Sequence, residues 1–145
     1  SFFADQQGEV DVVALKPQGP GQPRLVYLCE VTTHIEGMAR NTVKRVPAKL
    51  GRLREFAELT FPDEDHRFQW WSPYVNEGAI TEGFEQLCAD WNAEGRALEF
   101  IINDEYTRRI RQLIDHARGN TSTTNEPAYR MLQMLTHLRG EKPEL

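Results

Sequence analysis

The sequence predicts an α/β fold, in which a mixed β-sheet is sandwiched by helices. Segments with the residue pattern of β-strands, either alternating polar and apolar residues or short apolar runs, are interspersed with segments whose apolar residues recur at helical spacing. This order is typical of the α/β class. A chain of 145 residues with 39% hydrophobic residues can bury one sound core, so we expect a single domain over 1–145. Its predicted parts are an acidic hairpin at 1–34, a basic helix at 38–60, a strand–helix–strand unit at 66–103 and C-terminal helices at 104–145.

The first two strands form a hairpin. Residues 8–17 read GEVDVVALKP, and their alternation places Glu9 and Asp11 on one face. The Pro- and Gly-rich segment PQGPGQP then reverses the chain into a second strand over 25–32. Folding the strands together brings Asp11 beside Glu30, because directly opposed residues lie about 5 Å apart.

These carboxylates suggest a metal site. Two or three carboxylates at this spacing repel one another, and a hard divalent cation with oxygen ligands, of which Mg²⁺ is the expected one, relieves the repulsion. The alternative is that Glu9 and Asp11 are solvated charges at a strand end. The apolar run LVYL before Glu30 argues against it, because such a run indicates a central buried strand, at whose end unpaired charge is costly.

The segments GEVDVVAL and LVYLCEVTTH together resemble the PD-(D/E)XK nuclease superfamily, the fold of many restriction enzymes and Holliday-junction resolvases. In its commonest form an Asp early in one strand is followed by Glu-x-Lys at the end of the next. The resemblance covers about the first sixty residues, and its motifs are short. It implies a restriction-endonuclease-like core in which Asp11 and Glu30 bind Mg²⁺ or Mn²⁺. It also implies Glu9 as a further ligand or base and the carbonyl of Val31 as another ligand.

The position of the family's Lys is Thr32 in this chain, so no ammonium comes from that site. Members of the superfamily can supply the Lys from the following helix, which makes Lys44 and Lys49 the substitutes. His34 is a weaker candidate, since a surface-loop histidine is the commoner reading. Thr32 itself also fits an ordinary β-branched strand residue.

The family usually has a helix and a strand before the Asp strand, and the helix often carries another acidic residue. Only SFFADQQ precedes Gly8, and the chain does not begin with Met. We therefore expect a fragment or a processed chain that lacks the family's N-terminal helix.

A basic segment follows the hairpin. The net charge of −5 argues against overall attraction to nucleic acid, yet residues 39–54 carry six cations and no acidic residue. Pro47 suits the first turn of a helix whose apolar stripe would be buried. The predicted phosphate contacts are Arg40, Lys44, Arg45, Lys49 and Arg52. The alternative, a solvated helix face, has about equal weight, and proximity to the acidic strands favours the phosphate role slightly.

The middle of the chain supplies a strand and a helix. The strand HRFQWWSPYV should end at Pro73, which cannot continue regular pairing. Trp70 and Trp71 face opposite ways in a strand, so at least one should pack in the core. An amphipathic helix is predicted over 77–91, with Ile80, Phe84, Leu87 and Trp91 at helical spacing.

The last third predicts a strand and two helices. RALEFIIN is the strand, and Asp104 is a candidate cap for the helix that follows, which should bury Tyr106, Ile110, Leu113 and Ile114. Pro127 opens the final helix, whose predicted apolar side consists of Met131, Leu132, Leu135 and Leu138.

No segment has the length of a transmembrane helix and nothing reads as a signal peptide, so the chain is expected to be soluble and cytoplasmic. Cys29 and Cys88 lie in unlike contexts and lack zinc-site spacing, which favours buried thiols over a disulfide.

Three functional readings remain open. The first is an enzyme, a Mg²⁺-dependent endonuclease acting on DNA, with RNA not excluded and a homodimer possible. The second is a nuclease-like module that has lost catalysis and binds nucleic acid or protein, for which Thr32 is the best evidence. The third, a scaffold whose acidic residues bind nothing, is disfavoured by the coincidence of the acidic strands with a basic helix.

Overall fold

A computed structural model of the chain describes residues 10–32 and 44–138. The chain divides at Asn103 into two compact units, and each is described by itself. The first unit contains a mixed sheet and two helices, and the second contains a helical hairpin. The predicted α/β class is confirmed, with four strands and four helices among the described residues.

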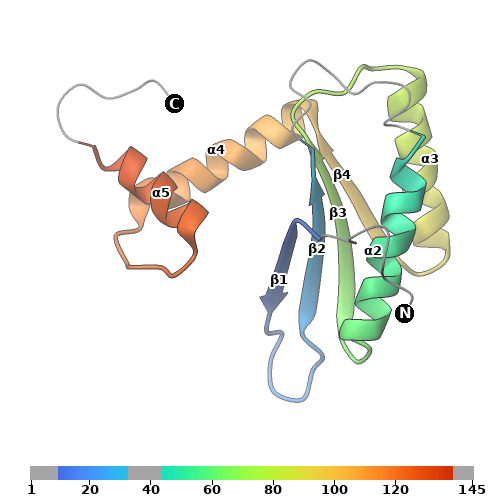
Figure 1. Cartoon of the computed structure of the whole chain (residues 1–145), viewed down its shortest axis with the longest axis horizontal. Coiled ribbons are helices and arrows are strands. Elements are labelled where there is room, and N and C mark those ends of the chain that lie inside the picture. Colours follow the sequence, from blue (N-terminus) through green and yellow to red (C-terminus); the bar gives the residue numbers. More distant parts are fainter. Residues whose placement is uncertain (1–9, 33–43, 139–145) are drawn as a thin grey trace, which may run out of the picture. The chain divides into compact units, whose positions relative to one another are not determined.

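The sheet has the order β1-β2-β3-β4 (Figure 1). Strand β1 pairs antiparallel with β2, whereas β3 and β4 each add in parallel. The parallel return after the basic helix is therefore confirmed. The strands are Val12–Lys16, Leu25–Val31, Asp65–Ser72 and Ala97–Ile102.

The loop between β1 and β2 contains the residues that turn the chain. Gly19 and Gly21 adopt φ of 140° and 73°, a region that other residues rarely occupy. The Gln18 amide donates to the carbonyl of Pro23 at 2.9 Å, which spans the loop. The resulting register pairs Lys16 with Leu25 and Val12 with Cys29, so the strand starts and ends meet as expected.

Helices α2 (Val46–Thr60) and α3 (Ala79–Ala93) pack on the same face of the sheet (Figure 1). Pro47 lies in the first turn of α2, where its missing N–H costs nothing. The predicted apolar stripe of α2 is confirmed, since Val46, Leu50, Leu53 and Ala57 are all buried.

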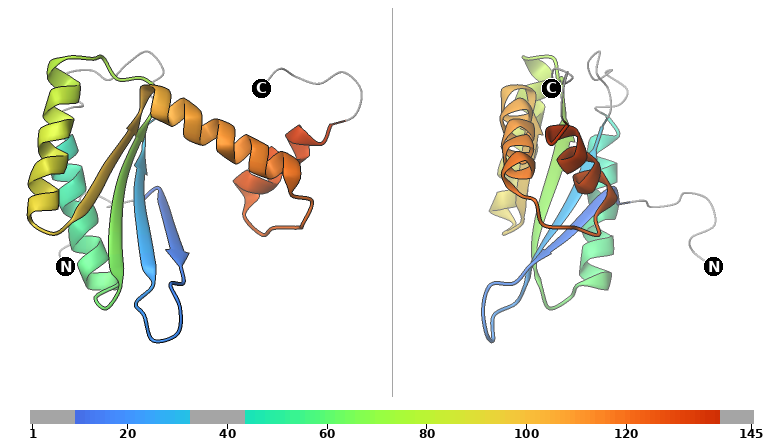
Figure 2. Two further views of the ribbon diagram at one scale, coloured as in Figure 1. Left: turned by 180° about the vertical axis from the view of Figure 1, so that it is seen from behind. Right: turned by 90° about the vertical axis from the view of Figure 1, so that its left-hand side faces the viewer.

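The core forms between these helices and alternate strand residues. On the sheet side it contains Val26, Leu28, Phe68, Trp70 and Leu98. Trp70 is buried and Trp71 is only partly so, which confirms the expectation for this pair. Within the described part of the first unit, α2 and α3 both lie on one face of the sheet (Figure 2). Local periodicity shows that a helix has an apolar side but not which face of a sheet it packs against.

Helix α3 ends in a motif that leads directly into β4. The N–H of Gly95 donates to the Asn92 carbonyl at 3.0 Å, and the N–H of Arg96 donates to the Trp91 carbonyl at 2.9 Å. Gly95 has φ of 75°, the left-handed conformation that this Schellman arrangement requires. The sharp reversal returns the chain along α3 as β4.

The second unit pairs α4 (Asn103–Gly119) with α5 (Pro127–Thr136). The two helices meet where His116 Nδ1 lies 2.5 Å from the Tyr129 hydroxyl. The Gln133 amide donates to the carbonyls of Asn120 and Ser122 at 2.8 and 3.0 Å, which fastens the connecting loop.

Two expectations for these helices are wrong. Helix α4 begins at Asn103, so Asp104 belongs to its first turn and is not its cap. Several side chains of the predicted apolar stripes are exposed, because a stripe is buried only where another element packs on it. They are Leu113, Met131, Leu135 and Leu138.

Among the described residues, no helix combines the length and the apolar character needed to cross a bilayer. The two cysteines are free thiols in the structure. Cys29 is buried as predicted, and burial raises the pKa of its thiol to about 11. Cys88 is only partly buried.

Candidate active site at the ends of strands β1 and β2

Asp11 and Glu30 lie together at one end of the β1–β2 hairpin. The last pair of the ladder joins Val12 to Cys29, so Asp11 stands one position further, level with Glu30. Asp11 Oδ2 accepts a hydrogen bond from the backbone N–H of Val31 at 2.7 Å. This bond holds the Asp11 carboxylate against the end of β2.

Glu30 is the one charged residue that is buried in the described part of the chain, with 5% of its surface exposed. It has the same strand parity as Val26 and Leu28, and it therefore points to the face covered by the helices. The side chain lies at the rim of the core because β2 ends one residue later, at Val31.

Lys49 supplies the cation beside Glu30. Its Nζ donates to Glu30 Oε2 at 3.2 Å, from the first turns of α2. The same ammonium lies 5.7 Å from the centroid of the Trp70 ring, within the range of a cation–π contact. Trp70 is the ladder partner of Glu30 on β3, so strand pairing and helix packing bring the three side chains together.

The charges around Glu30 do not fully offset its burial. Burial away from water raises the pKa of its carboxyl, and the negative charge of Asp11 raises it further. Lys49, through its hydrogen bond and its charge, and Arg52, through its charge, lower this pKa. The net pKa of Glu30 lies above its usual range. The site therefore still favours additional positive charge near this carboxylate.

Thr32 follows the end of β2 and contributes no charge. Its N–H donates to the Trp71 carbonyl at 2.9 Å, which continues the ladder by one bond. Its hydroxyl oxygen is buried without a hydrogen-bond partner. Thr32 is thus anchored through its backbone, and the ammonium at this site comes from Lys49.

The remaining candidates divide into two groups. Lys44 and Arg45 are exposed just before α2, Arg52 is exposed within it, and the charge of Arg52 lowers the pKa of Glu30. Glu9, His34 and Arg40 lie outside the described residues. The structure thus brings together Asp11, Glu30 and Lys49, and leaves Lys44 and Arg45 on the neighbouring surface.

The oxygen donors at the strand ends suit a hard divalent cation. Asp11 and Glu30 each have one carboxylate oxygen engaged in the bonds described above. The carbonyl of Val31 points to the same side of β2 as its N–H, the side of Asp11, because both groups of a strand residue share a direction. Carboxylate and carbonyl oxygens are the ligands that Mg²⁺ accepts. Within the described residues, however, no group of three acidic, His or Cys side chains gathers as a metal site.

Two contacts were missed by the sequence reasoning. The bond from the Val31 N–H to Asp11 depends on the strand end, and the contact of Lys49 with Trp70 depends on how α2 lies across β3. The only sequence signal for the contact of Lys49 with Trp70 is that Trp70 falls among the alternate residues of its strand that face the core.

Comparisons of this chain with protein-family models, with curated proteins and with solved structures find no match.

Proposed function

We propose that this chain is a Mg²⁺-dependent endonuclease with a restriction-endonuclease-like core that hydrolyses phosphodiester bonds in DNA. The observation that carries the proposal is the Lys49 ammonium at 3.2 Å from Glu30, beside Asp11. A lysine next to two carboxylates is the set that the PD-(D/E)XK resemblance requires, and here it is completed from a helix. Thr32 therefore does not remove the cation from the site.

Asp11, Glu30 and the Val31 carbonyl would hold the metal ion. Bound there, Mg²⁺ or Mn²⁺ would supply an activated water and charge neutralisation at the scissile phosphate. The raised pKa of Glu30 supports this assignment, because a second cation would stabilise the ionised carboxylate.

Lys49 would act on the phosphate. Its side chain is about half exposed at 46%, while Glu30 beside it is covered, so the ammonium can reach a substrate from solvent. A positive charge fixed next to the reacting group stabilises the negative charge that develops in the transition state. The exposed cations Lys44, Arg45 and Arg52 would bind the neighbouring phosphates.

The test compares metal binding and cleavage in one set of variants. Titration calorimetry with Mg²⁺ and Mn²⁺ should show binding to the wild type that is lost in Asp11→Asn and kept in Lys49→Met. Nicking of a supercoiled plasmid should be lost in both variants. Lys16→Met, which removes an exposed charge at the opposite end of β1, is the matched control and should cleave normally.

A different pattern would favour the second function, a nuclease-like module that binds nucleic acid without cutting it. Thr32 in place of the family's Lys supports this alternative, as does the ion pair in which Lys49 already compensates the charge of Glu30. In that case DNA would bind without being nicked, and Arg45→Ala with Arg52→Ala would weaken binding. Failure to bind either metal or DNA would contradict both functions.

A further inference from the structure

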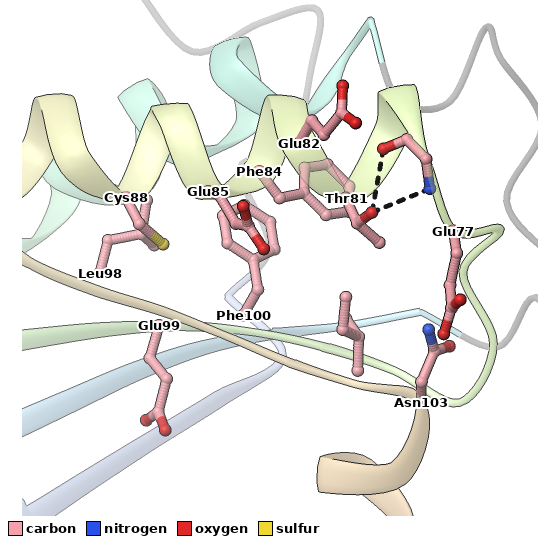
Figure 3. A pocket seen from close by; sticks show the side chains of 12 residues that line it. Glu77, Thr81, Glu82, Phe84, Glu85, Cys88, Leu98, Glu99, Phe100 and Asn103 are labelled. Atoms are coloured by element: carbon pink, nitrogen blue, oxygen red, sulfur yellow. Dashed lines mark hydrogen bonds between the residues drawn. The ribbon is translucent and has the colours of Figure 1, made fainter.

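A groove runs between helix α3 and the edge strand β4, apart from the acidic strand ends of β1 and β2. Its volume is about 740 Å³ (Figure 3). One wall is formed by Gly78 and by α3 as far as Cys88, and the floor is formed by β4 from Leu98 to Ile102. Asn103 lies at one end, where its amide bonds the N–H and carbonyl of Val75 at 2.8 and 3.0 Å and fixes the loop before α3.

Apolar side chains pack together along the groove. Phe84 and Phe100 stack with ring centroids 4.2 Å apart and an interplanar angle of 6°. Leu98 and Ile102 continue this surface along the strand. Side chains that are already packed lose little freedom when a ligand covers them, which lowers the cost of binding.

Strand β4 presents an open edge to this groove. Among the described strands it pairs only with β3. The N–H of Phe100 bonds the thiol of Cys88, so it points away from β3. Since alternate residues point the same way, the backbone groups of Leu98 share this outward direction. A thiol is a weak acceptor, and a peptide carbonyl would be a better partner for the Phe100 N–H.

The groove has one sign of charge. Glu82 and Glu85 are exposed on α3, and Glu77 precedes the helix (Figure 3). The side chain of Glu99 on β4 points away from α3, and its carboxylate accepts from the Gln69 amide at 3.0 Å (Figure 3). None of the described lining residues is a Lys, an Arg or a His. A neutral or acidic ligand would leave this charge uncompensated.

We propose that the groove binds an extended, cationic peptide segment of a partner protein, which adds to the sheet as a strand beside β4. Backbone hydrogen bonds to the open edge would supply affinity, as in other strand-addition complexes. Apolar side chains of the peptide would contact Phe100 and Ile102, which are only partly buried, and Lys or Arg side chains would pair with Glu82 and Glu85. The proposal does not depend on the nuclease function.

The charge of the groove argues against a second copy of this chain as the occupant. A symmetric edge-to-edge dimer would place the same surface of each copy against the other. The carboxylates of Glu77, Glu82 and Glu85 would then face their own counterparts, which is costly. A cationic segment instead complements them.

The first experiment measures binding of a short fluorescein-labelled peptide in which pairs of Val alternate with pairs of Lys or Arg, so that each face of the added strand carries both kinds of side chain. Fluorescence anisotropy at about 0.15 M salt should show saturable binding, since closely paired charges are only partly screened there. Two N-methylated peptides test the mode. One peptide is methylated at the backbone nitrogens of its odd-numbered residues and the other at those of its even-numbered residues. Only one of the two should still bind, because alternate N–H groups of the added strand face β4 and the rest point away from it. Equal binding of both would mean plain charge attraction and would overturn the proposal.

The second experiment locates the site. The double variant Glu82→Lys with Glu85→Lys should lower the affinity for the peptide by about tenfold or more, because both carboxylates are exposed in the groove. Glu55→Lys, on the exposed surface of α2, is the matched charge control and should bind as the wild type does. Equal loss in the control, or peptide-independent dimerisation in sedimentation velocity, would overturn the assignment of the groove to a peptide.

Discussion

The ammonium of Lys49 reaches the carboxylate of Glu30 from a position 19 residues further along the chain, at 3.2 Å. Three elements produce this contact. Strand β2 carries Glu30, α2 carries Lys49, and β3 provides Trp70 beneath both. The cation that the sequence lacks at Thr32 is thus restored in space by helix packing.

Replacing Lys49 by Met should destabilise the protein by about 1 kcal/mol at pH 7, because a mostly buried carboxylate loses its partner while the half-exposed lysine limits the effect. Urea unfolding measures the change. Lys49→Arg keeps the charge and should cost less, and Lys16→Met should have almost no effect. Equal stability of Lys49→Met and wild type would mean that the pair contributes nothing to folding.

Replacing Glu30 by Gln should change the pH dependence of stability. The pKa of Glu30 in the folded protein is raised above 4.5, so the folded state binds this proton more tightly than the unfolded state. The associated stability is present below pH 4.5 and is lost as the pH rises through the folded pKa. Thermal unfolding from acid to neutral pH in the absence of divalent metal should therefore show wild type losing stability relative to Glu30→Gln. Parallel curves for the two proteins would contradict this.

Two leucines of α2 provide a packing test within one helix. Leu50 is fully buried against the sheet, whereas Leu59 is 78% exposed. Leu50→Ala should cost about 3 kcal/mol through lost burial and the cavity left behind, and Leu59→Ala should stay within about 0.5 kcal/mol. Denaturant unfolding of both variants checks the placement of α2. Similar losses would show that this helix does not pack by its predicted stripe.

Two glycines test the end of α3. Gly95 has φ of 75° in the motif that leads into β4, and Gly83 lies within the helix with open space around its Cα. Gly95→Ala should destabilise the protein by about 1 kcal/mol, while Gly83→Ala should stabilise it by about 0.5 kcal/mol. Thermal unfolding distinguishes the opposite signs. If alanine were tolerated better at Gly95 than at Gly83, the described conformation at the end of α3 would be wrong.

Local patterns predicted the elements of this fold well. Strand alternation, the break at PQGPGQP and the position of Pro47 are all short-range signals, and they located β1, β2 and the first turn of α2. The helix predicted over 38–60 begins only at Val46, because residues 44 and 45 form a turn. The hairpin also placed Asp11 level with Glu30, because an antiparallel register follows from the loop that joins two strands.

The features that sequence reasoning missed depend on packing between distant segments. Leu113 belongs to an apolar stripe yet is exposed, because its burial depends on an element that the stripe does not specify. Lys44 and Lys49 were equivalent substitutes in the sequence, and only the placement of α2 across β3 selects Lys49.

The exposure of β1 has a consequence for the acidic pair. Every residue of Val12–Lys16 is exposed, and the strand pairs with β2 alone among the described strands. Such an edge element can detach by local opening at a lower free energy than the core. Asp11 would leave with it, whereas Glu30 and Lys49 remain on the buried body of the sheet. The affinity of this site for a cation would then include the free energy of pairing β1 with β2. A bound cation would slow amide hydrogen exchange in β1 before it affected any other part of the sheet.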